Sequence, residues 1–326
     1  MNMEERFLVT GALGCIGAWV VRNLVQAGAP VAVFDLASDP HRLRLIMTPD
    51  EVARVRFITG DITDLAALEK ALADTGATNL IHLAALQVPF CRADPPLGAR
   101  VNVVGTVNAF EAIKRAGLKR LVYASSFAVY GLNDEYPEGR VDDNAMLRPN
   151  SHYGVYKQAN EGTARIYWQD DGISSLAFRP YTVYGPGRDQ GMTSSPTKAM
   201  LAAAAGQGYH IPFGGRGLFQ YADDVAKAFI QASRAAVTGA GVYNLHGSGA
   251  HMRDIVAAIE AANPESRGRI TFDEKPLALA EDAAPAHLPA ELGQLPETEL
   301  NEGVAKTIAL FKTALAEGRL KAPVAA

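Results

Sequence analysis

A glycine-rich turn near the start of the chain limits the possible folds more than any other feature. A β-branched, strand-like stretch at residues 7–9 runs into Thr10-Gly11-Ala12-Leu13-Gly14-Cys15-Ile16-Gly17, and a helical pattern follows. Gly11 permits a tight turn, Gly14 lets the backbone approach a ligand, and Gly17 lets the helix pack closely on the strand. Free N–H groups at the helix start attract phosphates. The turn therefore predicts a pyrophosphate site that includes the backbone of Cys15 and Ile16.

An acidic residue at the end of the second strand-like run indicates which dinucleotide binds. Asp35 follows Val31-Ala32-Val33-Phe34 and lies about 20 residues beyond the glycine turn, where a carboxylate can accept hydrogen bonds from the adenosine ribose. The same charge would repel the 2′-phosphate of NADP, so the expected cofactor is NAD. Arg42 and Arg44 nearby leave NADP as an open alternative, because guanidinium groups bind phosphates.

Short β-branched runs alternate with helical patterns through the first part of the chain. Such alternation predicts an α/β fold with a Rossmann-type doubly wound parallel sheet that is covered on both faces. One helix is marked by Val103, Val107, Phe110 and Ile113 and stops at Gly117. The strand-like runs lie at residues 7–9, 31–34, 55–58, 80–83, 121–123 and 176–178.

The chain changes character after Pro180, where turn-rich segments separate the helical patterns. We expect residues 1–180, with about 220–250, to form the NAD-binding Rossmann domain. Residues 181–219 and 251–326 are expected to form a smaller substrate-binding lobe. Within it, the Ala- and Pro-rich stretch 276–296 is typical of a loop, and an amphipathic helix follows with Val304, Ile308, Phe311 and Leu315 on one side.

Composition excludes several other classes of protein. The 326 residues are 48% hydrophobic and 20% charged with a formal charge of -4, so we expect neither a nucleic-acid nor a membrane partner. No apolar run approaches membrane-spanning length, and residues 1–6 leave no room for a signal peptide. Cys15 and Cys91 are too few for a disulfide framework or a zinc site. These features predict a cytoplasmic protein without a metal.

Tyr153 and Lys157 form a candidate catalytic pair. They are four residues apart, so on a helix they project from the same side. A phenol is a poor base at neutral pH, and we expect the nearby ammonium and the positive nicotinamide ring to lower its pKa. Ser126, after the fifth strand-like run, is placed to bind the reacting oxygen and to stabilise its developing charge.

Taken in this order, the motifs resemble the extended short-chain dehydrogenase/reductase family, the NAD-dependent epimerase/dehydratase group. The resemblance covers roughly residues 6 to 250. Besides the glycine turn and the Tyr153/Lys157 pair, it is carried by Asp61-Ile62, His82-Leu83-Ala84-Ala85, Asn102-Val103-Val104-Gly105-Thr106, Ser125-Ser126 through Val129-Tyr130-Gly131, Arg179-Pro180 through Val183-Tyr184-Gly185-Pro186, and Tyr221-Ala222-Asp223-Asp224-Val225.

The resemblance implies roles for further residues of the cofactor site. Asp61 and Ile62 are expected to contact the adenine, and Pro180 and Tyr181 to border the nicotinamide. Asn102 is expected to support Lys157, often through water. The segment between the two halves of the cofactor is expected to be lined by Leu83, Ala84, Ala85 and Gln87. The family also implies a homodimer, built from the helices that contain Val103–Ile113 and Tyr153–Trp168.

Several departures from the family pattern bear on the substrate. Thr182 stands where nucleotide-sugar enzymes usually carry Asn, and Gly217 stands where they place an Arg, with Arg216 adjacent. No Lys or Arg lies between Lys275 and Lys306, where such enzymes commonly supply another diphosphate-binding Arg. A buried diphosphate needs paired cations, so these departures disfavour a nucleotide-diphosphate substrate.

The departures favour one of three functions. Dehydratases of this family follow the active-site Ser or Thr with Asp-Glu, whereas Phe127 and Ala128 stand here, so dehydration lacks its acid and base. Our first hypothesis is net dehydrogenation of a secondary alcohol on a sugar, sugar acid or small polyol, with Phe127 beside the substrate and Arg188 and Arg216 as candidate anchors for an anionic group. The alternatives are a nucleotide-sugar epimerase with a transient keto intermediate and a non-catalytic NAD-binding sensor.

Overall fold

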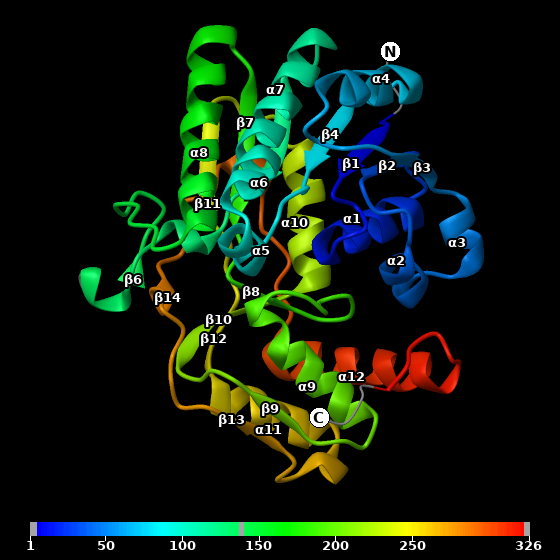
Figure 1. Cartoon of the computed structure of the whole chain (residues 1–326), viewed down its shortest axis with the longest axis vertical. Coiled ribbons are helices and arrows are strands. Elements are labelled where there is room, and N and C mark those ends of the chain that lie inside the picture. The colour runs from blue at the N-terminus through cyan, green and yellow to red at the C-terminus, as the bar shows by residue number, and fades with distance from the viewer. Residues whose placement is uncertain (1–4, 137–139, 323–326) are drawn as a thin grey trace.

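A seven-stranded parallel sheet forms the centre of the protein (Figure 1). The computed structural model describes residues 5–136 and 140–322. The strands run in the spatial order β11-β7-β5-β4-β1-β2-β3, and each neighbouring pair is parallel. The predicted doubly wound α/β fold is therefore confirmed. The strand bounds are β1 Phe7–Thr10, β2 Val31–Asp35, β3 Arg56–Thr59, β4 Asn79–His82, β5 Arg120–Ala124, β7 Ser174–Arg179 and β11 Ala240–Asn244.

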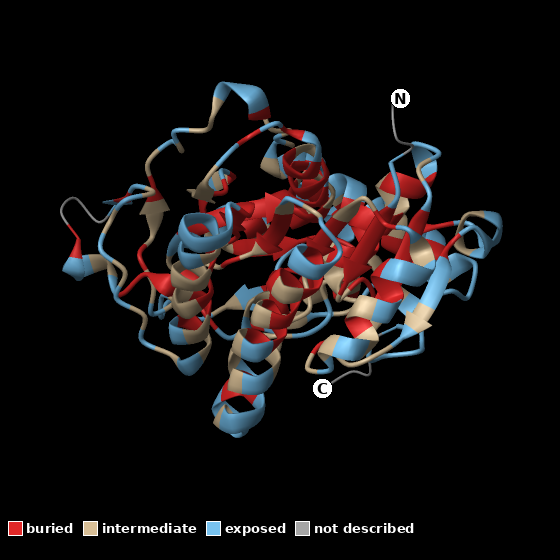
Figure 2. Ribbon diagram, turned by 90° about the horizontal axis from the view of Figure 1, so that it is seen from above, coloured by how far each residue is buried: buried red, intermediate tan, exposed pale blue. Residues whose placement is uncertain are grey.

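Helices cover both faces of this sheet, so its central strands are buried (Figure 2). In β1, Phe7 and Val9 join a hydrophobic cluster with residues of α1 (Cys15–Gln26) and α10 (Ala222–Arg234). Leu8, between them, joins a second cluster with residues of α4 (Leu65–Thr75) and α7 (Gly105–Arg115). Successive side chains of a strand point to opposite faces, which explains why these strands are apolar throughout.

The remaining helices of the first 180 residues connect the strands. The helix expected around residues 103–113 is α7, which follows a π-helical segment, Arg100–Val104. It ends just before Gly117, whose φ of 74° suits a glycine, as predicted. The other helices are α2 His41–Ile46, α3 Pro49–Ala53, α5 Val88–Ala93, α6 Pro95–Ala99 and α8 His152–Asp171.

Besides α10 and β11, three helices and most strands of the smaller sheets follow β7 in the part of the chain that the structure describes. Of these, α9, α11 and α12 lie together below the sheet in Figure 1. The segment 276–296 is irregular apart from β14 and a 3-10 turn at Ala290–Leu292, and the expected last helix is α12. The boundaries proposed for the two lobes stay a prediction. The bounds are β6 Arg140–Val141, β8 Thr182–Tyr184, α9 Ser195–Ala204, β9 Tyr209–Ile211, β10 Arg216–Tyr221, β12 Ser248–His251, α11 Met252–Ala262, β13 Ile270–Phe272, β14 Asp282–Ala283 and α12 Leu300–Ala316.

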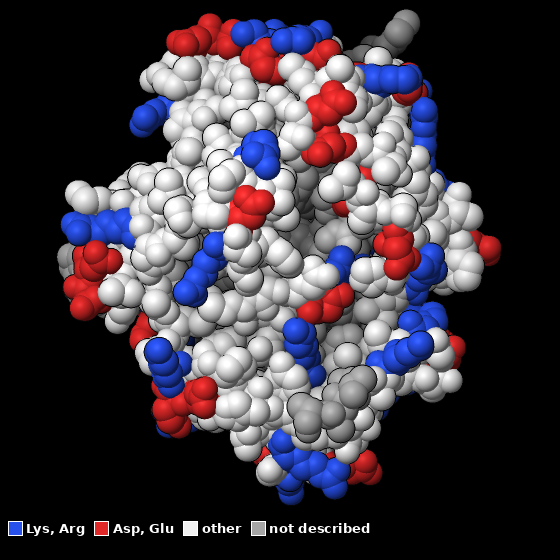
Figure 3. All heavy atoms as spheres, in the orientation of Figure 1, with Lys and Arg blue, Asp and Glu red and all other residues white. Residues whose placement is uncertain are grey.

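Surface charge is mixed on the face seen in Figure 3. Lys and Arg side chains are interspersed there with Asp and Glu. That face therefore offers no large patch of one sign for a polyanion. Among residues 5–136 and 140–322, no helix has both the length and the apolar character needed to cross a bilayer.

Candidate active site

A cavity of about 690 Å³ lies at the carboxyl ends of the parallel strands. It extends from the glycine-rich turn after β1 to the start of α8, which is where open α/β sheets bind their ligands. Of the predicted site residues, Asn102 and Arg216 do not line this cavity. Those that do are Gly11, Gly14, Cys15, Ile16, Gly17, Asp35, Asp61, Ile62, Leu83, Ala84, Ala85, Gln87, Ser126, Phe127, Tyr153, Lys157, Pro180, Tyr181 and Arg188.

The glycine-rich turn has the geometry that a bound pyrophosphate needs. Gly11 has a φ of 66°, and a Cβ at this position would lie 2.4 Å from the backbone nitrogen of Ala84. A Cβ at Gly17 would lie 2.4 Å from the carbonyl oxygen of Gly11. The start of α1 has no side-chain cap and no acidic residue in its first turn, so its N–H groups remain for an anion.

Burial raises the pKa of Cys15 in this turn to about 11, which keeps its thiol protonated at neutral pH.

The Asp35 side chain is fixed beside the glycine-rich turn. Its Oδ2 accepts a hydrogen bond from the backbone of Leu13 at 2.9 Å, and its Oδ1 accepts one from Ala37 at 3.0 Å. Each carboxylate oxygen has a further lone pair for a ribose hydroxyl. Asp61, after β3, likewise accepts a hydrogen bond from Thr63 at 2.8 Å and faces the cavity. The residues present thus fit a dinucleotide along this wall.

The structure brings Ser126, Tyr153 and Lys157 together at the other end of the cavity. The Ser151 hydroxyl caps α8 by accepting a hydrogen bond from Gly154 at 3.2 Å, so Tyr153 and Lys157 occupy successive turns. The Lys157 side chain is buried, with Nζ 2.7 Å from the carbonyl oxygen of Ala124 and 5.6 Å from the centre of the Tyr153 ring. Ser126 lies two residues after the end of β5, and its Oγ accepts a hydrogen bond from the backbone of Ala128 at 3.2 Å.

Burial is the largest influence on the pKa values of Tyr153 and Lys157. Burial raises the pKa of Tyr153, whereas its hydrogen bond with Ser126 and the positive charge of Arg188 lower it. Burial lowers the pKa of Lys157 from its ordinary 10.5 to about 8. Lys157 Nζ donates a hydrogen bond to the carbonyl oxygen of Ala124 and lies over the Tyr153 ring. That Lys157 and the nicotinamide ring together lower the pKa of Tyr153 stays a prediction.

Comparison with known proteins identifies the family. Residues 7–245 match the sequence profile of the NAD dependent epimerase/dehydratase family. The chain belongs to this family. Over 320 residues it is 31% identical to the UDP-glucose 4-epimerase of Mycolicibacterium smegmatis, an alignment that covers 94% of this chain and 98% of that protein.

Solved structures of similar proteins agree with the fold. The Thermus thermophilus UDP-glucose 4-epimerase in complex with NAD has a TM-score of 0.79 at 28% identity, with 95% of this chain and 99% of that chain covered. The L-threonine dehydrogenase of Clostridium difficile has a TM-score of 0.81, with 98% and 100% covered, but its 18% identity shows the fold alone. As a member of the NAD-dependent epimerase/dehydratase family, the protein is an enzyme and its cofactor is NAD, which sets aside the sensor hypothesis.

Close to Ser126 and Lys157 lies a buried ion pair that the sequence analysis did not assign to the site. Arg179 of β7 and Glu161 of α8 are 4% and 8% exposed, and their closest nitrogen and oxygen are 2.8 Å apart. Ser125, next to Ser126, donates a hydrogen bond to the same carboxylate. Glu161 therefore ties the end of β5 to α8. The sequence could have indicated Glu161 through its position four residues after Lys157, because this spacing places both side chains on one side of a helix.

Two predicted site residues lie elsewhere. Asn102, in the π-helical segment, is fully buried, and its side chain accepts a hydrogen bond from the backbone nitrogen of Leu86 at 2.8 Å and donates one to the carbonyl oxygen of Leu86 at 3.0 Å. It thus holds the cavity wall, and its support of Lys157 stays a prediction. Arg216 is exposed at the start of β10, away from the cavity lining.

Proposed function

We propose that this enzyme oxidises a secondary alcohol of a sugar, a sugar acid or a related small polyol and releases the ketone. The observation that carries the proposal is that Ser126, Tyr153 and Lys157 meet in one cavity with the glycine-rich turn and Asp35. NAD bound along this cavity serves as the hydride acceptor. The alcohol then has to lie between the nicotinamide end of the cavity and Tyr153.

The residues of the chain handle the proton. Tyr153 acts as the base in its phenolate form, whose oxygen accepts the proton of the substrate hydroxyl. The positive charge of Arg188 favours the phenolate and so opposes the effect of burial. The Ser126 hydroxyl, already hydrogen-bonded to Tyr153, orients the reacting oxygen. Lys157 uses one N–H on Ala124 and has others for the nicotinamide ribose.

The charge of the cavity supports a small substrate with at most one anionic group. Among the cavity-lining residues that the structure describes, the basic ones are Arg42, Lys157 and Arg188. Arg42 is paired with Asp189, and Lys157 belongs to the catalytic group. Arg188 donates to the Thr193 hydroxyl at 2.8 Å, and its Nε is buried without a partner. One guanidinium suits a carboxylate, whereas a diphosphate needs more than one cation.

A nucleotide-sugar epimerase is the competing function. It is favoured by the 31% identity to the M. smegmatis UDP-glucose 4-epimerase over nearly the whole length of both proteins. An epimerase keeps its keto intermediate bound and returns the hydride to it, so it produces no net NADH.

A steady-state assay separates the two functions. We expect NADH to accumulate with a member of a panel of polyols, aldonates and uronates, and no turnover with UDP-sugars. Tyr153→Phe is expected to abolish this turnover. Tyr156→Phe, on the same helix but bonded to the carbonyl oxygen of Pro95 outside the cavity, is the matched control and is expected to retain it. Interconversion of UDP-sugars without NADH accumulation would refute the dehydrogenase.

The anchoring role of Arg188 has a separate test. Arg188→Gln is expected to raise KM for a sugar acid by about tenfold and to change KM for a neutral polyol much less, because only the acid loses an ionic partner. An equal change for both substrates would contradict the anchor and leave the proposed reaction intact.

We also propose a homodimer formed through α7 and α8. Large apolar side chains are exposed on α8 and just before α7, namely Val104, Val155, Ile166 and Trp168. Exposed apolar residues concentrated on neighbouring helices are typical of a protein interface. The cytoplasmic location stays a prediction.

A further inference from the structure

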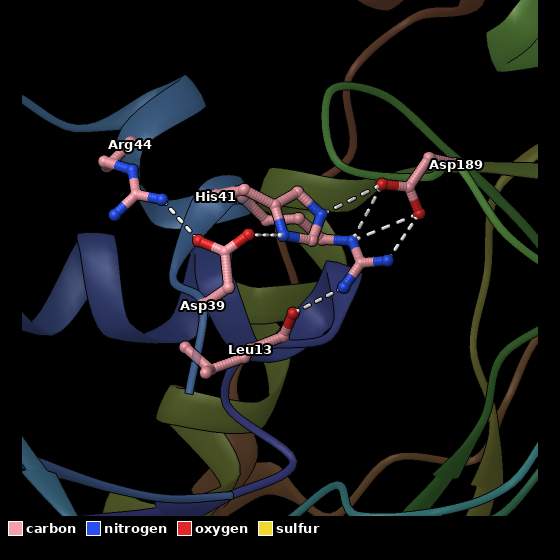
Figure 4. Close-up of polar contacts among 6 residues, drawn as sticks. Leu13, Asp39, His41, Arg44 and Asp189 are labelled. Carbon is pink, nitrogen blue, oxygen red and sulfur yellow. Dashed lines mark hydrogen bonds and ion pairs between the residues drawn. The ribbon is translucent and has the colours of Figure 1, made fainter. Parts of the chain in front are cut away.

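Three basic side chains of α2 contact acidic residues. Arg44 pairs with Asp39, and His41 lies 3.4 Å from both Asp39 and Asp189. Arg42 binds both carboxylate oxygens of Asp189, with the closest contact at 2.6 Å. Figure 4 shows that Asp189 enters this network from a loop facing α2. This loop joins β8 to the residues before α9.

Arg42 lies at the adenosine end of the cofactor cavity. Its Nη1 donates a hydrogen bond to the carbonyl oxygen of Leu13 at 2.7 Å. The backbone nitrogen of the same Leu13 donates to Asp35 at 2.9 Å, so the guanidinium and the expected ribose-binding carboxylate flank one residue. The Arg42 side chain is only 12% exposed and lines the cavity, whereas the Arg44 side chain is 58% exposed and does not.

A dinucleotide with a 2′-phosphate would need a cation at this place. The 2′-phosphate projects from the ribose hydroxyl beside Asp35, and a guanidinium is the usual partner for it. Arg42 is the cavity-lining cation that is connected to Asp35, through the hydrogen bonds of both with Leu13. However, two nitrogens of its guanidinium group already donate to Asp189. Asp189 also adds a second negative charge that opposes the phosphate.

We propose that Asp189 is a determinant of cofactor specificity, because it occupies the Arg42 guanidinium and so denies NADP a partner for its 2′-phosphate. Selection for NAD then depends on two carboxylates from distant parts of the chain. Asp35 binds the ribose hydroxyls and repels the phosphate, and Asp189 neutralises Arg42, the cavity-lining cation that would offset this repulsion. Asp189 acts through Arg42 and takes no part in hydride transfer.

Fluorescence titration with NADPH and NADH tests the proposal without any substrate, so its outcome is independent of the proposed reaction. Asp189→Asn keeps the size of the side chain and one acceptor oxygen, while it removes the negative charge and the second acceptor that hold Arg42. We expect the ratio of NADPH affinity to NADH affinity to rise about tenfold, as a single charge-assisted contact provides. NADH remains the tighter ligand, because Asp35 is unchanged.

Two further variants make the test specific to Arg42. In Asp189→Asn/Arg42→Gln the gain in relative NADPH affinity is expected to disappear. Asp39→Asn releases the exposed Arg44 outside the cavity and is the matched control, with no change expected in the affinity ratio. The proposal is overturned if Asp189→Asn leaves the ratio unchanged, or if the gain persists without the Arg42 guanidinium.

Discussion

Replacing Lys157, the buried lysine of the proposed catalytic group, should stabilise the protein while it removes activity. Lys157 is 4% exposed, and burial lowers its pKa from 10.5 to about 8. At neutral pH this shift corresponds to a cost of about 3 kcal/mol for carrying the charge in the folded state. Lys157→Met keeps a similar volume and removes that cost. It also removes the hydrogen bond to Ala124, which is worth about 1 kcal/mol.

The expected net gain is about 2 kcal/mol at pH 7. For 326 residues, with an unfolding entropy of about 2 cal/mol/K per residue, this raises the Tm by about 3 °C. We expect kcat of the same variant to fall by at least about a hundredfold. Thermal unfolding followed by circular dichroism, without added cofactor, measures the first effect, and the NADH assay measures the second.

The stability difference between Lys157→Met and the wild type should decrease as the pH rises. Below pH 8 the folded protein carries the charged lysine and its full cost. Between pH 8 and 10.5 the folded state releases the proton while the unfolded state keeps it, so the wild type gains stability relative to Lys157→Met. The advantage of the variant should vanish near pH 9.5. The exposed Lys119→Met serves as control, with no pH-dependent gain expected. A Lys157→Met protein less stable than wild type at pH 7, or a gain that does not change with pH, would refute the reasoning.

Three further predictions concern the fold around the site. Glu161→Gln leaves Arg179 buried without its charge partner and should lower stability by about 3 kcal/mol, measured by urea unfolding; a loss below about 1 kcal/mol would contradict the importance of the pair. Gly11→Ala should destabilise the protein by more than about 1 kcal/mol and weaken NADH binding, because its Cβ would lie 2.4 Å from the nitrogen of Ala84; normal NADH affinity in a titration would refute this. Ile166→Asp should convert the proposed dimer to a monomer in analytical ultracentrifugation, and a wild-type species of only 34.7 kDa at micromolar concentration would reject the dimer.

Local patterns predicted the parts of the structure that depend on neighbouring residues. The glycine turn, six strands of the main sheet and the Tyr153/Lys157 spacing each follow from a period or a short motif, and the structure places them as expected. β11 was not recognised, since Ala240–Asn244 begins Ala-Gly and carries little β-branched character. Its strand state comes from pairing with β7, which is a tertiary effect.

Contacts between distant segments could not be predicted from the sequence. Arg42 and Asp189 are 147 residues apart. The sequence around Arg42 is typical of the start of a helix and that around Asp189 of a charged loop, so neither segment indicates the other as its partner. The effect of burial on the Tyr153 pKa was also missed, because burial is set by residues from several elements.

The pairing of β11 with β7 has a consequence for how the enzyme is made. Every residue of β7 is buried in the finished protein, yet its outer edge is completed only by a strand that ends at Asn244. While the ribosome is still adding the intervening residues, β7 presents unpaired N–H and C=O groups and apolar side chains to water or to another nascent chain. Chains that stop before β11 should therefore aggregate rather than accumulate as a folded cofactor-binding fragment.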